Sequence, residues 1–353
     1  MTRVDYSLPP FRVQAYGAGV QSTALLALWA LEEPMERRDG STWRGFFPQG
    51  RPDLVCFADT QSESSGIYTN VEEARALVEA AGVRFEVVTN GDLANPPKAS
   101  TGTQGIFVPL FTLSTKGRWE NHSTPVNPFD VARWTELRDK LELHADAATQ
   151  REFDAIATED IKVWIPPGEQ GQLRRQCTSR YKIEPIVALS KKLAGNRPIE
   201  MWLGLSADEV QRAKTSPSDG MQYYYPLIFD QENTVDPEYY EYAHLAPVNR
   251  NDCIRYLVEL ETTPAKSACV FCPYRSEWAW ARMKTEDPQS FEKACEYDER
   301  MRDVRPGYQL FVHRSRTPLR DVVFQANDVR TLALFEDFDM SLSGGCEEGY
   351  CGL

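Results

Sequence analysis

The chain has 353 residues, of which 42% are hydrophobic and 26% are charged, and this balance is typical of a folded globular protein. Its 16 Phe, 15 Tyr and 8 Trp residues exclude a chain that is disordered throughout. The formal net charge of −13 excludes nucleic-acid binding through the overall field, because phosphate binding needs a basic surface. It leaves room for a local basic groove.

The sequence also limits the cellular setting. No apolar run approaches the roughly 18 residues of a membrane span, and the first 10 residues lack the apolar centre of a secretory signal. We therefore expect a cytoplasmic protein without a membrane partner. The 8 cysteines of such a chain predict metal binding or redox chemistry and not a disulfide framework.

The N-terminal region alternates between predicted strands and predicted helices. Apolar strands are expected at residues 11–15, 53–58 and 83–88, with helices at 24–31 and 68–81 between them. A further helix at 179–193 precedes a buried strand at 199–205. This order predicts an α/β fold with a doubly wound, mostly parallel sheet of the Rossmann-like kind.

The remaining segments are less regular. We expect a long loop at 90–120, which is rich in Gly, Pro, Ser and Thr, and polar helices over 130–161 that end at Pro166-Pro167-Gly168. Other loops are expected at 216–220 and 230–238. Short helices are predicted at 250–260, 278–283 and 291–302, and the Gly- and Cys-rich end at 341–353 is expected to be mobile.

A small-residue loop connects the first predicted strand to its helix. Its sequence is Gly17-Ala18-Gly19-Val20-Gln21-Ser22, which allows backbone N–H groups to converge on an anion at the helix N-terminus, with the Ser22 hydroxyl as a further donor. It is neither a Walker A loop nor a dinucleotide fingerprint. The alternative is a plain tight turn between strand and helix.

Charged residues follow two other predicted strands. Asp59 comes directly after the strand at 53–58, and Asp208 and Arg212 follow the strand at 199–205. Ligands of open parallel sheets bind beyond the carboxyl ends of the strands, so these side chains are candidates for the same crevice. Helix capping is the alternative role.

A cationic segment interrupts the acidic chain between residues 174 and 182. Its four cations are Arg174, Arg175, Arg180 and Lys182. Arginine holds phosphate or sulfate through two parallel hydrogen bonds, so the segment favours a polyanionic ligand. The alternative is a solvated start of the following helix.

Cysteines suggest a metal centre and a reactive tail. Cys269-Val270-Phe271-Cys272-Pro273 is typical of one edge of an iron–sulfur or zinc site, and Cys177 and Cys253 could complete four thiolates. A thioredoxin-type dithiol and a buried structural pair stay open. Near the C-terminus, Cys346 and Cys351 could reach an active site, or the tail is inert.

Together these motifs resemble the phosphoadenosine phosphosulfate (PAPS) reductase-like family of the PP-loop adenine nucleotide α-hydrolase group. The resemblance lies in blocks between residues 11 and 273: the loop with Gly17, Gly19 and Ser22, the Asp59-Thr60 strand end, the Cys177-Thr178 segment and Cys269-x-x-Cys272. ATP-cleaving members usually carry Asp where this chain has Gln21. The ending Tyr350-Cys351-Gly352-Leu353 resembles the reductases' terminal segment, whose cysteine attacks the sulfur of activated sulfate.

The resemblance implies a HUP/PP-loop fold in several parts. We expect a nucleotide-binding half at 1–118, a helical insertion at 119–168, the second nucleotide-binding half at 169–245, and a C-terminal Cys-rich helical region at 246–353. The implied cofactor is a [4Fe-4S] cluster held by Cys177, Cys253, Cys269 and Cys272, with zinc as the alternative. The implied nucleotide is PAPS, adenylyl sulfate or ATP.

The implied function is a PAPS or adenylyl sulfate reductase-like enzyme. In that reaction Cys351 attacks sulfur, and an external thiol such as thioredoxin, or Cys346, resolves the adduct. Replacing Cys351 with Ser is expected to abolish sulfite release. The first alternative is an ATP-dependent sulfurtransferase that modifies nucleic acid, with a partner protein supplying the nucleic-acid contact. The second is a non-catalytic module that senses a nucleotide or a cluster.

Overall fold

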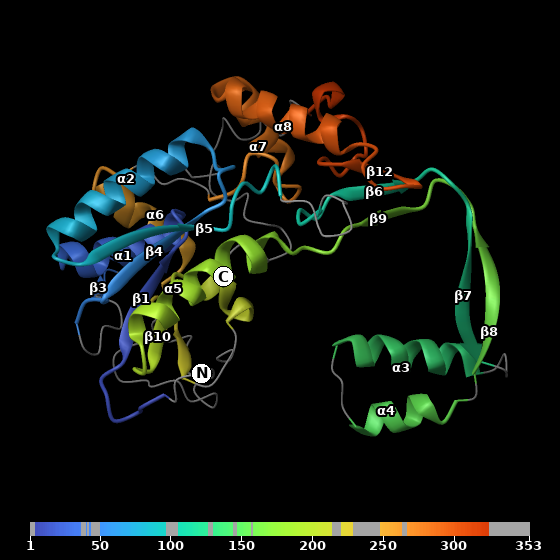
Figure 1. The fold of residues 1–353 in the computed structure, drawn as a ribbon, viewed down its shortest axis with the longest axis horizontal. Helices are drawn as coiled ribbons and strands as arrows, with labels where there is room; N and C mark the ends of the chain where they lie inside the picture. The colour runs from blue at the N-terminus through green and yellow to red at the C-terminus, as the bar shows by residue number, and fades with distance from the viewer. Residues whose placement is uncertain are drawn as a thin grey trace.

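The centre of the fold is a five-stranded, all-parallel sheet (Figure 1). Its strands, in the spatial order β11-β10-β1-β4-β5, are β11 (Met221–Tyr224), β10 (Ile199–Leu203), β1 (Phe11–Tyr16), β4 (Leu54–Asp59) and β5 (Arg84–Thr89). The computed structural model describes residues 4–36, 40, 42–43, 50–96, 105–125, 130–143, 147–156, 158–213, 220–228, 248–262 and 267–324. The expected α/β architecture is confirmed, and it is compatible with a Rossmann-like fold.

The order in which strands are added to the sheet reverses beside β1. From β1 the chain continues through α1 (Val20–Leu31) to β4 and through α2 (Ser65–Ala80) to β5, on one side of β1. β10 pairs with the other side of β1, with Ala15 opposite Leu203. In open parallel sheets, ligands bind at the carboxyl ends of the strands where the order reverses. The expected ligand site is therefore at the ends of β1 and β10.

Helices cover both faces of the sheet, because successive side chains of a strand point to opposite faces. Tyr16 and Phe57 pack on one face with α1, α2 and α6 (Arg250–Glu259). Ala15 and Cys56 pack on the other face with α5 (Glu184–Ala194). The helix predicted at 179–193 is confirmed as a π-helical turn, Ser179–Ile183, followed by α5. Pro185 lies in the first turn of α5, where its missing N–H is not needed.

A second layer contains α7 (Glu277–Glu286), α8 (Pro288–Met301) and a small antiparallel sheet. The sheet has the order β12 (Tyr308–Phe311), β6 (Phe111–Ser114) and β9 (Gln170–Gln172). The helices predicted at 278–283 and 291–302 are confirmed. The loop predicted at 90–120 is wrong at β6, because that short strand is stabilised by pairing with segments far away in the sequence.

An arm projects from the second layer (Figure 1). It is a hairpin of β7 (Arg118–Pro125) and β8 (Thr158–Ile165), with α3 (Val131–Leu143) and α4 (Ala147–Asp154) at its far end. The arm falls on the segment 119–168, which was predicted to be a helical insertion. The helical prediction for 130–161 is wrong at residues 158–161, since these begin β8 and pair with β7.

The described elements also include short ones. They are β2 (Met35–Glu36), β3 (Thr42–Trp43) and two 3-10 turns, η3 (Ala207–Arg212) and η6 (Leu319–Asp321). Among the helices of the described residues, none has both the length and the apolar character required to cross a bilayer. The loop predicted at 230–238 and the Cys-rich end at 341–353 lie outside the described residues.

Candidate functional site

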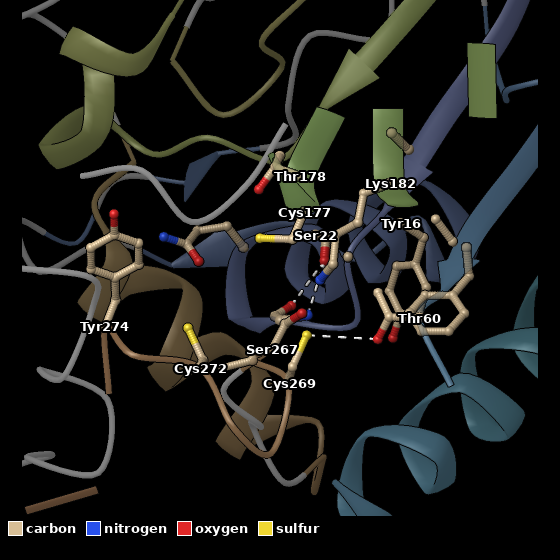
Figure 2. A pocket seen from close by; sticks show the side chains of 18 of the residues that line it. Tyr16, Ser22, Thr60, Cys177, Thr178, Lys182, Ser267, Cys269, Cys272 and Tyr274 are labelled. Atoms are coloured by element: carbon tan, nitrogen blue, oxygen red, sulfur yellow. Dashed lines mark hydrogen bonds between the residues drawn. The ribbon is translucent and has the colours of Figure 1, made fainter. Parts of the chain in front are cut away.

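A pocket opens at the carboxyl ends of β1 and β10 (Figure 2). It is lined by the loop after β1, the segment that leads into α5, the residues after β10, the start of α6 and the turn at 267–274. The predicted site residues that line it are Gly17, Gly19, Gln21, Ser22, Arg175, Cys177, Lys182, Arg212, Cys269 and Cys272. The glycine loop and part of the cationic segment therefore share one pocket.

The loop after β1 is held in a bent conformation at the N-terminus of α1. Ala18 is fully buried and has a φ of 53°, which is rare for a residue with a side chain. Gly19 caps α1: its N–H donates to Ser22 Oγ over 3.2 Å, and the Ser22 hydroxyl donates back to the Gly19 carbonyl over 3.1 Å. The Ser22 hydroxyl therefore closes the helix cap, while the first turn of α1 supplies the N–H groups that can meet an anion.

Two buried contacts fix the position of this loop. Gln14 is fully buried in β1; it accepts a hydrogen bond from Trp29 Nε1 at 2.6 Å and donates to the Ser22 carbonyl over 2.9 Å. At the end of β10, a Cβ on Gly204 would lie 2.7 Å from both the Cα and the N of Ser22. Only glycine allows the end of β10 to approach the loop this closely.

Two arginines lie beside the loop at one end of the pocket. Arg212, in η3, pairs with Glu209, and its side chain is only 10% exposed. Arg250, at the start of α6, donates to Gln21 Oε1 over 3.4 Å, and Gln21 Nε2 donates to Glu209 Oε2 over 3.0 Å. Gln21 therefore connects the loop directly to Arg250, and to Arg212 through Glu209.

Arg175 lies on another wall of the pocket. Its Nη2 donates to the Thr178 hydroxyl, and its guanidinium lies 5.6 Å from the ring centroid of Tyr274. Within the described residues, the buried Arg175 Nε, Arg212 Nη2 and Arg250 Nε atoms have no hydrogen-bond partner. Burying a charged group without all of its partners costs free energy, so these donors favour an anionic ligand in the pocket.

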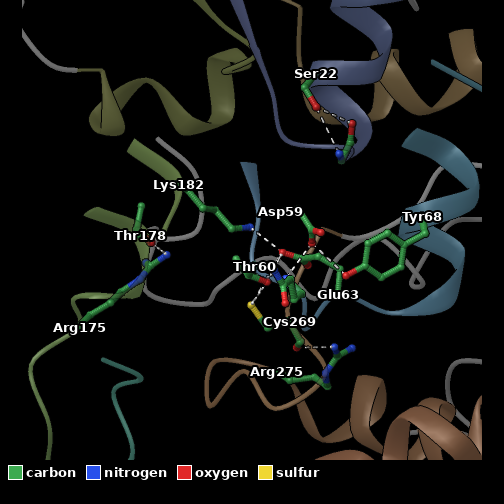
Figure 3. A network of polar contacts seen from close by, with 12 residues as sticks. Ser22, Asp59, Thr60, Glu63, Tyr68, Arg175, Thr178, Lys182, Cys269 and Arg275 are labelled. Atoms are coloured by element: carbon green, nitrogen blue, oxygen red, sulfur yellow. Dashed lines mark hydrogen bonds and ion pairs between the residues drawn. The ribbon is translucent and has the colours of Figure 1, made fainter. Parts of the chain in front are cut away.

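Lys182 meets a buried carboxylate in the pocket wall (Figure 3). Its Nζ lies 3.2 Å from Glu63 Oε1, and the same oxygen accepts a hydrogen bond from Thr60 Oγ1 at 3.1 Å. The Glu63 side chain is completely buried, and its Oε2 has no partner within the described residues. Burial alone would lower the pKa of Lys182, but the Glu63 carboxylate and the Cys269 sulfur raise it above its ordinary value.

Cys269 extends this network. Its Sγ lies 3.6 Å from Thr60 Oγ1 and donates to Glu63 Oε1 over 3.9 Å. Burial raises the pKa of the Cys269 thiol well above its ordinary value; Glu63 adds to the rise and Lys182 opposes it. Burial also raises the pKa of Cys272, against the opposing charges of Arg275 and Arg175. Both thiols are therefore protonated at neutral pH.

The structure does not assemble the four predicted metal ligands. Cys177, Cys269 and Cys272 line the pocket, but Cys253 lies on α6, fully buried in the apolar cluster against α1. It points to that core because it shares the buried face of α6 with Ile254, Tyr256 and Leu257. Within the described residues, no three His, Cys, Asp or Glu side chains form a group that could hold a metal ion. Cys253 therefore does not lie with the other three predicted ligands, and the [4Fe-4S] or zinc site stays a prediction.

Several other predicted residues lie away from the pocket. Arg174 is exposed, and the exposed Arg180 pairs with Glu184 at 3.2 Å, one helical turn along. Asp59 accepts hydrogen bonds from the Tyr68 hydroxyl at 3.0 Å and from a backbone N–H. Asp208 is exposed and accepts from the Arg250 N–H at 2.9 Å, at the first residue of α6, whose N-cap is Asn249. Arg180, Asp59 and Asp208 therefore have local partners outside the pocket, and Asp59 does not cap a helix, because the N-cap of α2 is Ser64.

Some pocket residues carried no usable signal in the sequence. Arg250 begins α6 and is far in sequence from the other cations, and Gly204 follows an apolar strand without any motif. Only the sheet order brings them to the loop. Ser267 and Tyr274 likewise reach the pocket through the turn that carries Cys269. Cys346 and Cys351 lie outside the described residues.

No family model matches this chain, and no curated protein matches it. The function is therefore argued from the chemistry of the pocket.

Proposed function

We propose that the chain is a PAPS or adenylyl sulfate reductase-like enzyme, which binds an adenine nucleotide in this pocket and performs thiol-dependent sulfur chemistry on it. One observation carries the proposal. A single pocket at the ends of β1 and β10 combines a helix N-terminus, arginines with unpartnered N–H groups, and three cysteine thiols. A nucleotide that carries an activated sulfate needs these groups together.

The anionic part of the ligand would lie at the start of α1. The unpaired N–H groups of the first helical turn and the partial positive charge of the helix favour a phosphate there. Arg212 and Arg250 would add charge-assisted hydrogen bonds from Nη2 and Nε, the atoms that have no partner within the described residues. The 10% exposure of Arg212 means that little water competes for its charge.

The base and the sulfur would occupy other walls. Tyr16, Phe57 and Val108 line the pocket and offer an apolar surface for a planar ring. Cys177, Cys269 and Cys272 line it from the segment before α5 and from the turn at 267–274. When a thiol attacks sulfur, the nucleotide phosphate leaves with its negative charge, and the arginines would stabilise that charge. A thiol reductant such as thioredoxin would restore the enzyme.

The first test separates pocket arginines from exposed ones. Arg212→Met and Arg250→Met are each expected to remove about 1.5–3 kcal/mol of binding free energy, which is roughly a 10- to 100-fold loss of affinity for PAPS or adenylyl sulfate. Arg174→Met is the matched control, because Arg174 is exposed and does not line the pocket. Titration calorimetry measures the affinities of wild type and the three variants, with circular dichroism as the check of folding.

Equal affinities in all four proteins would contradict the proposed binding mode. Turnover then identifies the reaction: anaerobic incubation with ATP, adenylyl sulfate and PAPS in turn, scored for sulfite and pyrophosphate. Sulfite supports the reductase. Pyrophosphate released only with ATP and nucleic acid would instead favour a sulfurtransferase, and tight binding with neither product would favour a sensing module.

A further inference from the structure

One carboxylate lies among the cations of the pocket. Among the described residues that line it, Glu209 is the single acidic side chain, beside the cations Arg175, Lys182, Arg212 and Arg250. Glu209 belongs to η3, the turn that follows β10, and its side chain is 21% exposed. An anion that enters this pocket therefore meets one negative charge as well as several positive ones, and like charges repel.

Both oxygens of the Glu209 carboxylate are bonded to groups beside the glycine loop. Oε1 pairs with Arg212 Nη1, and Oε2 accepts a hydrogen bond from Gln21 Nε2 at 3.0 Å. Gln21 is the second residue of α1, directly after Val20 and the cap Gly19. The carboxylate therefore lies beside the N-terminus of α1, which is where the proposed function puts a phosphate.

The arginines near Glu209 retain donors that it does not use. Arg212 Nη2 and Arg250 Nε are buried and have no hydrogen-bond partner within the described residues. A carboxylate carries one charge on two oxygens, whereas a phosphate group carries about 1.5–2 negative charges and three strong acceptor oxygens. A phosphate can therefore satisfy the unused donors together with those that Glu209 holds, and it is the stronger partner for both arginines.

The Glu209 side chain is able to give up its contacts. It is 21% exposed, so part of it already meets water, and a change of side-chain rotamer would carry the carboxylate outwards. Its partners are less free to move, because the Arg212 side chain is 10% exposed and Gln21 is buried at the start of α1. The carboxylate is therefore the member of this group that can turn into solvent.

We infer that Glu209 competes with the nucleotide phosphate for Arg212 and Gln21, and so determines how tightly the pocket holds charged nucleotides. This inference rests on the proposed function and concerns the same site. The bound phosphate takes the donors that Glu209 holds, and the displaced carboxylate turns to solvent. Repulsion between the two anions weakens the binding of a charged nucleotide and helps a charged product to leave.

The test compares Glu209→Gln with wild type by titration calorimetry on the full-length chain. The probes are adenosine, which is neutral, and adenylyl sulfate and PAPS, which carry increasing negative charge. The substitution removes the charge of the side chain at nearly constant size. We expect adenylyl sulfate and PAPS to bind at least about 10-fold more tightly, because a close like charge is lost, and adenosine affinity to stay unchanged.

Glu184→Gln is the matched control for this variant. Glu184 is exposed, pairs with Arg180 and does not line the pocket, so the same chemical change there should alter none of the three affinities. Weaker or unchanged binding of both anionic nucleotides to Glu209→Gln would overturn the inference, because Glu209 would then position Arg212 instead of competing with the ligand. An equal gain for adenosine would also overturn it, since a neutral ligand does not compete for a cation.

A crystal structure of wild type with adenylyl sulfate gives a second measurement that needs no variant. The phosphate is expected to contact Arg212 and Gln21, with the Glu209 carboxylate turned towards solvent. A complex in which Glu209 keeps both of its contacts would overturn the inference.

The same titrations keep this inference apart from the proposed function. Binding of the nucleotides to wild type without any gain in Glu209→Gln refutes the competition and leaves the binding proposal standing. Absence of nucleotide binding to both proteins refutes the proposed function, and the competition with it.

Discussion

At the residue scale, neighbours decide what a charged side chain does. Arg175 and Lys182 come from the same cationic segment as Arg174 and Arg180, yet only the first two line the pocket. Lys182 lies 3.2 Å from Glu63, so its charge compensates a carboxylate that is completely buried. Lys182 was predicted to neutralise phosphate, and in the structure its charge also neutralises the buried Glu63 carboxylate in the pocket wall.

Removing this compensation should destabilise the fold. Lys182→Met leaves Glu63 buried without its cation, and breaking such a pair costs about 3 kcal/mol, the lower end of the usual range because Lys182 is 24% exposed. The double variant with Glu63→Gln removes both charges and should lose clearly less. Urea unfolding of the two variants and wild type measures the difference. Equal losses of unfolding free energy in the single and double variants would show that the unpaired Glu63 charge does not cause the destabilisation.

At the scale of elements, the site depends on how closely β10 approaches the loop after β1. A Cβ at Gly204 would meet the backbone of Ser22, not a flexible side chain, so the loop itself would have to move. The same loop is held in place by buried Gln14 of β1, which donates a hydrogen bond to the Ser22 carbonyl. The first turn of α1 is therefore positioned by two strands, β1 and β10. β10 lies far from α1 in sequence, since it begins at Ile199 and α1 begins at Val20.

Gly204→Ala tests this positioning. We expect about 1–3 kcal/mol of lost stability from overpacking. The proportional loss of nucleotide affinity is expected to be larger than the loss of stability, because the displaced backbone carries the N–H groups that we propose bind the anion. Gly66→Ala is the control, since a Cβ there meets nothing within 4 Å and α2 should gain slightly from alanine. Unfolding curves and calorimetry report the two effects. Affinity that is unchanged in Gly204→Ala would remove this contact from the binding site.

At the scale of the whole molecule, the arm is separate from the pocket. None of its described residues lines the pocket, and Figure 1 shows it projecting away from the central sheet. At its base, β6 and β9 continue into β7 and β8 and are already paired, with the Gly168 N–H donating to the Ser114 carbonyl over 2.8 Å. The pairing of β6 with β9 therefore continues to the base of the arm and does not need the arm itself.

Deletion of the arm is expected to leave nucleotide binding intact. Residues 118–165 would be replaced by a short Gly-Ser turn between β6 and β9, whose antiparallel pairing suits such a connection. The free energy of binding for adenylyl sulfate should then change by less than about 0.5 kcal/mol, the usual effect of changes away from a site. Calorimetry on the shortened chain measures it. A large loss would place the arm in the binding function.

The sequence alone determined the local parts of this protein. Apolar runs predicted four of the five strands of the central sheet, all but β11, and small residues after the first strand predicted a tight loop there that lines the pocket. These elements could be predicted because strands, helices and turns depend on neighbours a few positions away in the chain.

Only the tertiary structure decided which of these residues meet. Pairing of β10 with β1 brought Gly204, Arg212 and Arg250 to the loop, while the buried face of α6 took Cys253 into the core and away from the other thiols. Strands β6 and β8 were missed because long-range pairing stabilises them and their own sequences show too little periodicity. Contacts between distant segments depend on sheet order and helix rotation, and neither can be read from the residues next to each other in the chain.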